Sequence, residues 1–302
     1  METFCKDIDR SKKPCLHYKP TGQCLLSERR LCPEYILNKK PVLSYSYNST
    51  YTRCRKAWYH NYILGTAPVG KSLPMLYGQL FHAQLAFHQT RNPFFETEIK
   101  KITSIIYDIE TDSDYPKDLK TLNGFLNAYK QLPISVFHAD SEAEKENYME
   151  YPDFILKTTV DLYEPIKKII YDWKWTAKPD NYGFFTTRLQ AGLYLLANTD
   201  ARAITYRLFR KPALKQTKKE RDIDFIGRVE KSVLSSPKHY IIDKTFWRSE
   251  YNFDEIKTNF YAISEEIKTN LLKGEDYFYE NYSGCFNPFQ CSYLNQCEAG
   301  II

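Results

Sequence analysis

Two neighbouring apolar runs in the middle of the chain predict a pair of β-strands. The runs FILKTTVDLY (154–163) and IKKIIYDW (166–173) are rich in β-branched and aromatic residues, which are enriched in strands. Glu164 and Pro165 lie between the runs and favour a turn. We therefore expect an antiparallel hairpin whose strands are buried on both faces.

Apolar positions elsewhere recur at helical spacing or in short runs typical of strands. The expected helices lie at about 45–63, 76–90, 116–131, 186–198, 219–235 and 254–273, and a further strand lies at 202–209. Helices interspersed with strands favour layers of helices around a central sheet. The predicted fold class is therefore α/β, with a central mixed sheet flanked by helices and a functional site at the edge of the sheet.

Three charged residues fall near the ends of the two predicted strands. Asp172 and Lys174 are two residues apart, and side chains at this spacing on a strand point to the same face. The hairpin would bring Asp161 alongside them. Carboxylate oxygens bind Mg²⁺ or Mn²⁺, the metal polarises a phosphodiester and activates water, and a lysine stabilises the developing charge. A lone D-x-K triplet is also common where an ordinary strand reaches solvent, so the neighbouring motifs decide between the two interpretations.

Further motifs surround these three residues in a fixed order. The segment LSYSYNSTYTRCRKAWYHNYILG (43–65) is followed by GQLFH (78–82), Asp161, Asp172-Trp173-Lys174 and Gln190-Ala-Gly-Leu-Tyr194. These five motifs, in this order, resemble the RecB-like branch of the PD-(D/E)xK nuclease superfamily. That branch includes the AddB and RecB nuclease domains, CRISPR-adaptation nucleases and phage exonucleases. The resemblance covers residues 43–297 and implies a restriction-endonuclease-like central sheet.

The resemblance assigns a metal site to four of these side chains. His82 would be a metal ligand on a helix, Asp161 and Asp172 would be the carboxylate ligands, and Lys174 would be the catalytic lysine. Family members usually have glycine three residues before the first aspartate, where this chain has Thr158, so the local backbone path is expected to differ. Taken alone, His82 would be an ordinary buried histidine of its helix.

Gln190 and Tyr194 match the Q-x-x-x-Y motif of the same family. The two side chains are one helical turn apart and lie on the same face of the predicted helix. Family members use this pair to hold DNA near the metal. The alternative is that Gln190 is a surface residue and that Tyr194 belongs to the core.

Four of the eight cysteines are split into one before the predicted nuclease core and three after it. Cys54 lies in the first predicted helix, and Cys285, Cys291 and Cys297 lie in SGCFNPFQCSYLNQCEAG. This split resembles the iron-sulfur members of the family, in which four thiolates hold a 4Fe-4S cluster and staple the two ends of the domain together. The usual C-x2-C-x5-C spacing is altered, because Pro288 occupies the usual first position. Zinc on the same ligands is the alternative, followed by free buried cysteines.

The amino-terminal stretch at 1–37 holds the other four cysteines and predicts a small metal-binding module. Either of two four-ligand shells would suit tetrahedral Zn²⁺, namely Cys15, His17, Cys24 and Cys32, or Cys5, Cys15, Cys24 and Cys32. The stretch has few apolar residues and would need a metal in order to fold. Disulfides are disfavoured, because the charged first residues lack the apolar stretch of a secretory signal. The remaining residues, 38–302, are expected to form one nuclease domain that the iron-sulfur cluster closes.

Composition narrows the class of protein without adding a site. With 43% hydrophobic and 16% aromatic residues, the chain of 302 residues can bury a sizeable core and is unlike disordered proteins. Its apolar runs are too short to span a bilayer, so we expect no membrane partner and a cytoplasmic location, in a bacterial host cell if the gene is phage-borne. The net charge of +5 permits nucleic-acid binding but does not require it.

The stretch RLFRKPALKQTKKERD (207–222) gathers most of the local positive charge. Such a run is usually a solvated surface, but here it follows the Q-x-x-x-Y helix, so phosphate contacts are a hypothesis. The aromatic residues near the other basic segment are expected to be core rather than base-stacking residues, namely Tyr51, Trp58, Tyr59 and Tyr62.

The sequence as a whole predicts a metal-dependent DNA exonuclease that hydrolyses phosphodiester bonds by attack of metal-activated water. Its substrate would be single- or double-stranded DNA with free ends, in phage or bacterial recombination and repair. A single-strand-annealing recombinase is a candidate partner on the resemblance alone. Two alternatives stay open: a structure-specific endonuclease, and a non-catalytic nucleic-acid-binding protein whose metals are purely structural.

Overall fold

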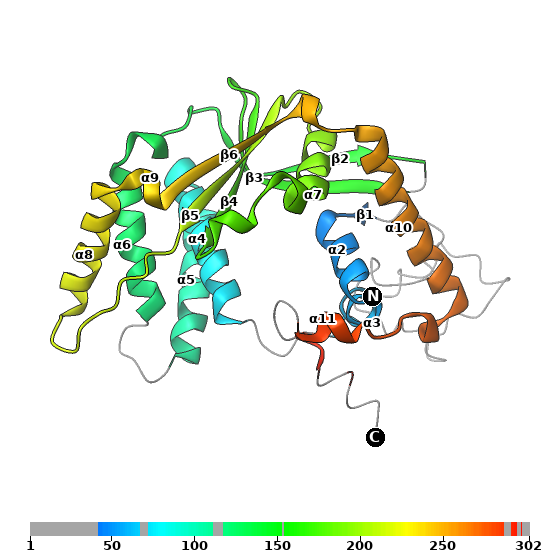
Figure 1. Ribbon diagram of the computed structural model, residues 1–302, viewed down its shortest axis with the longest axis horizontal. Coiled ribbons are helices and arrows are strands. Elements are labelled where there is room, and N and C mark those ends of the chain that lie inside the picture. Colours follow the sequence, from blue (N-terminus) through cyan, green and yellow to red (C-terminus); the bar gives the residue numbers. More distant parts are fainter. Residues whose placement is uncertain are drawn as a thin grey trace. The chain divides into compact units, whose positions relative to one another are not determined.

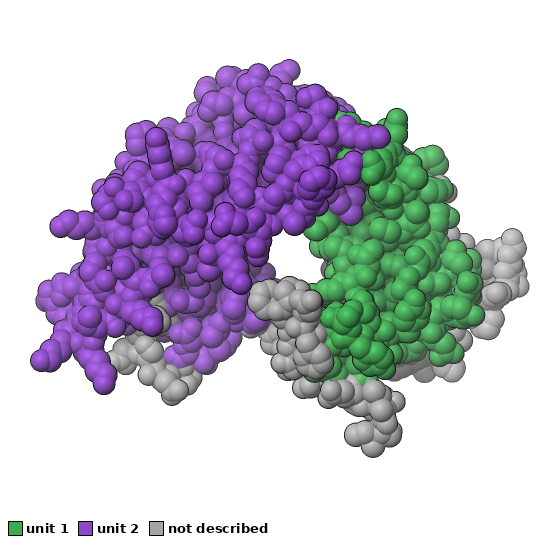
Figure 2. All heavy atoms as spheres, in the orientation of Figure 1, with its two compact units in different colours: residues 1–70, 148–158, 253–302 green, residues 71–147, 159–252 purple. Residues whose placement is uncertain are grey.

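The computed structural model divides the chain into two compact units. It describes residues 42–66, 72–110, 117–152, 154–286, 291–294 and 297 (Figure 1). Unit 1 holds the described residues within 1–70, 148–158 and 253–302, and unit 2 holds those within 71–147 and 159–252 (Figure 2). The predicted zinc module and its ligands lie outside the described residues and stay predictions, namely Cys5, Cys15, His17, Cys24 and Cys32.

A mixed β-sheet forms the centre of unit 2. Its strands β3 (Ile155–Glu164, in this unit from residue 159), β4 (Ile169–Thr176), β5 (Ala203–Arg210) and β6 (Ile241–Trp247) follow one another in that order, and β2 (Glu142–Glu150, in this unit up to residue 147) pairs with β3. Strands β3 and β4 are antiparallel, β4 and β5 are parallel, and β5 and β6 are antiparallel. The predicted hairpin and the predicted α/β arrangement around a mixed sheet are both confirmed.

Helices cover both faces of this sheet (Figure 1). The helices of unit 2 are α4 (Leu73–Thr90), α5 (Pro93–Ile109), α6 (Lys117–Gln131), α7 (Phe184–Ala197), α8 (Asp222–Ser235) and α9 (Pro237–Tyr240). On one face, α4, α5, α6 and α8 bury Tyr171, Trp173 and Phe209 in a single apolar core. Because alternate strand residues point to opposite faces, Asp172, Lys174 and Tyr206 point to the other face, where α7 contacts β5 through Gln190.

One member of the basic stretch at 207–222 is a core residue rather than a surface charge. Arg207 is 4% exposed, and its guanidinium donates two hydrogen bonds of 2.8 Å to the carboxylate of Asp243. The same guanidinium lies 5.1 Å from the centre of the Tyr171 ring and donates to the carbonyl of Ile134. The hypothesis of a phosphate contact is therefore wrong for Arg207, whose charge is used inside the protein.

Unit 1 combines residues from both ends of the described chain. It contains β1 (Val42–Leu43), α2 (Tyr45–Arg53), α3 (Arg55–Tyr59), a π-helical turn (His60–Leu64), α10 (Phe253–Lys273) and α11 (Tyr282–Phe286). Strand β1 pairs in parallel with residues 155–156 of β3, which belong to this unit. The aromatic rings of the first helices form its core as expected: Trp58 stacks on Phe278 at 5.4 Å, and Tyr51 meets Trp58 edge-on.

The predicted helix at 45–63 is interrupted at Cys54. This residue has extended backbone angles (φ −160°, ψ 116°), and its sulfur accepts a hydrogen bond from the amide of Ala57 at 3.5 Å. Cys54 therefore ends α2 and caps the start of α3. The elements that the sequence pattern did not predict include α5, β2 and β6. Within the described ranges, no helix combines the length and apolarity needed to cross a membrane.

Candidate active site

Asp172 and Lys174 meet on one face of β4, as the two-residue spacing predicts. Lys174 Nζ lies 2.5 Å from Asp172 Oδ1. The Asp172 carboxyl is 1% exposed and lies beside Tyr206 in the parallel β4–β5 pair. Burial raises its pKa to about 6, although the ammonium of Lys174 acts in the opposite direction. The Asp172 carboxyl is therefore a buried acid, and the nearby ammonium of Lys174 stabilises its charged form.

Asp161 lies where β3 separates from β4. The paired residues of the two strands end at Leu162 and Tyr171, one position before Asp161 would meet Asp172. At this opening the Asp161 side chain takes over the contact between the strands, because its Oδ2 accepts a hydrogen bond from the Trp173 amide at 2.5 Å. The separation leaves room for side chains from neighbouring elements to reach Asp161.

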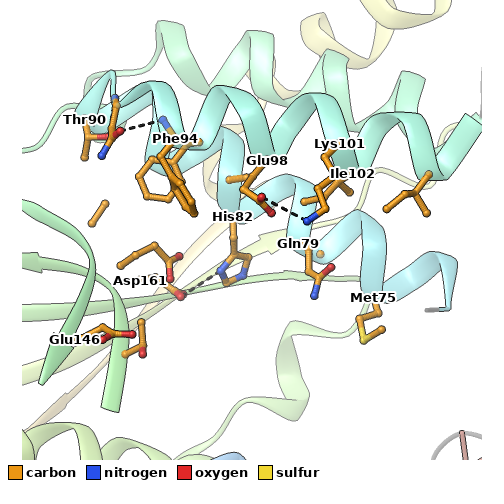
Figure 3. Close-up of a pocket in the computed structure, with 18 residues that line it drawn as sticks. Met75, Gln79, His82, Thr90, Phe94, Glu98, Lys101, Ile102, Glu146 and Asp161 are labelled. Carbon is orange, nitrogen blue, oxygen red and sulfur yellow. Dashed lines mark hydrogen bonds and ion pairs between the residues drawn. The ribbon is translucent and has the colours of Figure 1, made fainter. Parts of the chain in front are cut away.

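His82 of α4 is one of these side chains. Its Nδ1 lies 3.2 Å from Oδ1 of Asp161 (Figure 3). Burial opposes charge on both groups, but each stabilises the charged form of the other. The pKa of Asp161 is accordingly lowered, with Lys174 and the Trp173 amide contributing, and the pKa of His82 is raised. The motif GQLFH thus delivers its histidine to the first aspartate, and His82 is not an isolated core residue.

Glu144 of β2, which the sequence analysis did not identify, completes a group of three possible ligands. One ligand atom each from His82, Glu144 and Asp161 lie within 4.8 Å of one another. Glu144 has a positive φ of 51°, which is uncommon outside glycine. This conformation breaks the alternation of the strand, and the adjacent residues Ala143 and Glu144 both line the same pocket. Burial and the charge of Asp161 raise the pKa of Glu144 to about 7.

These residues fit a divalent cation. Carboxylate oxygens and an imidazole nitrogen are ligands that Mn²⁺ and Mg²⁺ accept, and three such atoms already converge here. The Oδ1 atom of Asp172 is buried and has no hydrogen bond of good geometry, although Lys174 is close to it. Burial raises the pKa of both Glu144 and Asp172, so a cation would offset the cost of keeping these carboxylates charged.

Gln190 and Tyr194 face the same site from α7. The Gln190 amide donates to the Tyr194 hydroxyl at 3.3 Å, and the Tyr206 hydroxyl donates to Gln190 Oε1 at 3.2 Å. Burial raises the pKa of Tyr194 well above its usual range, and the charges of Asp172 and Asp161 add to this shift. The helical spacing correctly predicted that the two side chains share a face. Tyr206, which orients Gln190, was not predicted.

A pocket of about 970 Å³ opens beside His82 and Asp161 (Figure 3). Its walls come from α4, α5, β2 and β3 of unit 2. Phe94 and Glu98 line the α5 side, and Glu144 lines the side of β2. The three-residue ligand group is therefore part of the wall of a larger cavity.

The four cysteines assigned to a cluster all belong to unit 1. Cys54 precedes α3, Cys285 lies in α11, and Cys291 and Cys297 follow it in the sequence. Among the described residues, none of the four takes part in a disulfide. Burial raises the pKa of Cys297 to about 11, and the thiols of Cys54, Cys291 and Cys285 contribute through their charges, so the four groups are close enough to interact.

Direct contacts hold the cysteine-bearing segments in place. Asn281 Nδ2 donates to the carbonyl of Arg53 at 2.7 Å, and the amide of Cys291 donates to the carbonyl of Cys285 at 2.7 Å. A Cβ added at Gly284 would lie 2.8 Å from the Arg53 carbonyl oxygen, so only glycine allows α11 to approach this closely. Arg53, which precedes Cys54, thus packs directly against the segment that carries Cys285.

Comparisons with known proteins identify the fold. The family model of the PD-(D/E)XK nuclease superfamily matches residues 42–298. No curated protein matches the chain. A solved structure from Eubacterium rectale, provisionally named an exonuclease, is 11% identical, covers 93% of this chain and 95% of that chain, and has a TM-score of 0.53. A phage-related exonuclease from Haemophilus somnus is 16% identical, covers 67% of this chain and 99% of that chain, and has a TM-score of 0.33. The family match and the first likeness confirm the predicted restriction-endonuclease-like fold class.

Proposed function

The chain belongs to the PD-(D/E)XK nuclease superfamily, and we propose that it is a divalent-metal-dependent DNA exonuclease of the RecB-like branch. One observation carries this proposal: Asp161, Asp172 and Lys174 converge where β3 separates from β4, with His82 3.2 Å from Asp161. Hydrolysis of a phosphodiester needs acidic metal ligands and a nearby cationic side chain, and this place in the fold supplies both.

Asp161, His82 and Glu144 would hold the cation, with Asp172 beside them. When bound, Mg²⁺ or Mn²⁺ supplies Lewis acidity toward the phosphodiester and lowers the pKa of a coordinated water. The hydrogen bond between Asp161 and the Trp173 amide fixes the direction of one carboxylate. The contact between His82 and Asp161 fixes the imidazole against the same carboxylate, so two of the ligands are oriented before a metal arrives.

Lys174 would act as the catalytic lysine. Its ammonium pairs with Asp172, and the neighbouring carboxylates raise its pKa, so the side chain stays cationic. A positive charge held here opposes the negative charge that develops on the phosphate during attack of water. The pairing also aligns Asp172, because both side chains leave the same face of β4.

Gln190 and Tyr194 would position the DNA strand. They form a hydrogen-bonded row with Tyr206 along the face of the sheet that also carries Asp172. Amide and hydroxyl groups of this kind bind phosphate and sugar oxygens without reading sequence. Their place beside the acids favours a role in aligning the scissile phosphate.

Cys54, Cys285, Cys291 and Cys297 would hold a 4Fe-4S cluster in unit 1. Support comes from the effect of the other three thiols on the pKa of Cys297 and from the close approach of α11 to Arg53. Zinc on the same thiolates is the competing assignment. Iron and sulfide analysis of anaerobically purified protein, with its visible spectrum, separates the two. A colourless protein with stoichiometric zinc at these cysteines would overturn the cluster.

The remaining parts of the proposal rest on the family resemblance. The stretch at 1–37 would form the zinc module, and the biological setting would be phage or bacterial recombination and repair in the cytoplasm. A single-strand-annealing recombinase is the candidate partner in that setting.

The decisive experiment compares linear and closed circular DNA. End-labelled linear DNA and covalently closed circles are incubated with Mg²⁺ or Mn²⁺ and the wild-type protein, with Asp172→Ala and Lys174→Ala in parallel. The expected result is loss of linear DNA alone, abolished in both variants. Cutting of circles would replace the exonuclease by an endonuclease, and cleavage of neither would favour a protein that only binds nucleic acid.

A further inference from the structure

The pocket beside the ligand group has acidic walls. Glu98 of α5 and Glu144 and Glu146 of β2 line it, whereas Lys101 is its only lysine among the described residues. That lysine pairs with Glu98 at 3.7 Å (Figure 3). A cation at the ligand group would attract one phosphate, but the rest of the pocket would repel a second one.

The same pocket carries an exposed aromatic ring. Phe94 lies at the start of α5, lines the pocket and is 61% exposed. The neighbouring Phe95 is buried and meets the Phe94 ring edge-on at 5.4 Å. The amide of Phe94 donates to the Asn92 side chain at 3.0 Å, which fixes the backbone at this point. The result is a flat apolar ring in the pocket wall, open to a planar ligand.

The size of the pocket suits a nucleoside. Its volume of about 970 Å³ is at the upper end of the range for sites that bury small organic ligands. Its wall includes His82 and Asp161, so a ligand that places a phosphate against the proposed metal ligands extends directly into it. A nucleotide within a strand has a phosphate on each side, whereas a terminal nucleoside has only the phosphate that joins it to the strand.

We propose that this pocket binds the terminal nucleoside of a DNA strand, with its base stacked on Phe94, and that its acidic walls select ends without a terminal phosphate. This inference rests on the proposed nuclease function and adds the identity of the bound end. Stacking on an aromatic ring accepts any base, so the pocket distinguishes the ends of strands rather than sequences.

Fluorescent oligonucleotides test the stacking. Single strands with 2-aminopurine at the 3′ end, at the 5′ end or in the middle are bound to Lys174→Ala in the presence of Ca²⁺, so that cleavage does not interfere. Quenching of the terminal base is expected at one of the ends. Adding Phe94→Ala should abolish the quenching and weaken binding about tenfold, since base stacking contributes roughly that much to affinity.

Two further variants control this measurement. Phe94→Leu keeps an apolar side chain and should also lose the quenching. Trp247→Leu removes an aromatic ring that is 47% exposed on β6, at the opposite edge of the sheet from β2, and should change nothing. Equal quenching in Lys174→Ala with and without Phe94→Leu would overturn the role of Phe94.

Terminal phosphates test the acidic walls. A phosphate on the bound end should weaken binding several-fold relative to a hydroxyl, and Glu98→Gln should reduce this difference, because it removes a negative charge and frees Lys101. Lys101→Gln is the matched variant and should not reduce it. Equal binding of both kinds of end would overturn the selection.

The proposal for the pocket and the proposal of a nuclease function can be overturned separately. Cleavage of linear DNA by the wild-type protein is measured in the same preparations. If Phe94→Ala changes neither DNA binding nor the rate of cleavage from the ends, the proposal for the pocket is overturned. The proposal of an exonuclease then still stands. Quenching that depends on Phe94, in a wild-type protein that never cleaves, would support the pocket and overturn the exonuclease.

Discussion

Asp161 Oδ2 accepts a hydrogen bond from the amide of Trp173 at 2.5 Å, at the position where main-chain pairing between β3 and β4 has stopped. Here a side-chain carboxylate accepts the hydrogen bond that a backbone carbonyl accepts elsewhere in a sheet. The strands can therefore separate without leaving the Trp173 amide unpaired, and the separation is what admits His82 to the site.

Lys174→Ala should remove cleavage while leaving the fold and metal binding intact. Loss of a preorganised charge at a reacting phosphate costs roughly 100- to 1,000-fold in rate. Lys178→Ala is the matched control, because Lys178 is exposed just beyond β4. Rates are measured on end-labelled DNA, and Mn²⁺ affinity is measured by calorimetry. A wild-type rate of DNA cleavage in Lys174→Ala would contradict the catalytic role of Lys174.

Asp161→Asn should abolish stabilisation by metal. The amide oxygen can still accept from Trp173, so the strands should keep their arrangement, but the charge that attracts a cation is lost. Added Mn²⁺ should raise the melting temperature of the wild-type protein and not that of Asp161→Asn, and EDTA should reverse the rise. Asp254→Asn, at a carboxyl whose side chain is 93% exposed, should respond like wild type. An equal Mn²⁺ effect in Asp161→Asn would place the metal elsewhere.

Two helical glycines should respond in opposite directions to alanine. A Cβ at Gly124 of α6 would lie 2.6 Å from the carbonyl oxygen of Ile226 and 2.8 Å from Cβ of Val229, both in α8. Gly124→Ala should therefore destabilise the protein by about 1–3 kcal/mol. Gly227 of α8 has open space around it, so Gly227→Ala should stabilise by about 0.5–1 kcal/mol through helix propensity. Urea denaturation measures both, and the same sign for the two variants would contradict the close packing of α6 on α8.

Arg207→Met should lower stability without affecting DNA binding. It leaves Asp243 without its two hydrogen bonds and removes the cation beside the Tyr171 ring. Because Asp243 is 34% exposed and can be partly rehydrated, the loss of these interactions costs about 1–3 kcal/mol. Lys219→Ala, at an exposed lysine of the same stretch, should leave stability unchanged. The comparison fails if Arg207→Met unfolds at the same urea concentration as wild type.

Local rules predicted the part of the site that depends on neighbouring residues in the sequence. The β-branched runs and the turn at Glu164 located the hairpin. The two-residue spacing placed Asp172 and Lys174 together, and the four-residue spacing placed Gln190 beside Tyr194. Each of these relationships follows from the geometry of one element.

Relationships that depend on distant residues could not be read in this way. Arg207 looks like a surface charge until Asp243, 36 residues later, pairs with it. Glu144 is one of several acids in a polar strand, and the sequence does not reveal the positive φ and partial burial that set it apart from Glu142 and Glu146. Tertiary packing decides both cases. The acidic composition of β2 also lacks the apolar run that would have marked it as a strand.

The unusual backbone of Glu144 has a consequence for how the protein behaves in concentrated solution. Within the described part of the chain, β2 pairs with β3 alone and so forms a border of the sheet, where strands from neighbouring molecules can add. The irregular conformation at Glu144 and the run of charges along β2 both discourage such recruitment. The feature that turns an acid toward the pocket thereby also protects this border of the sheet from aggregation.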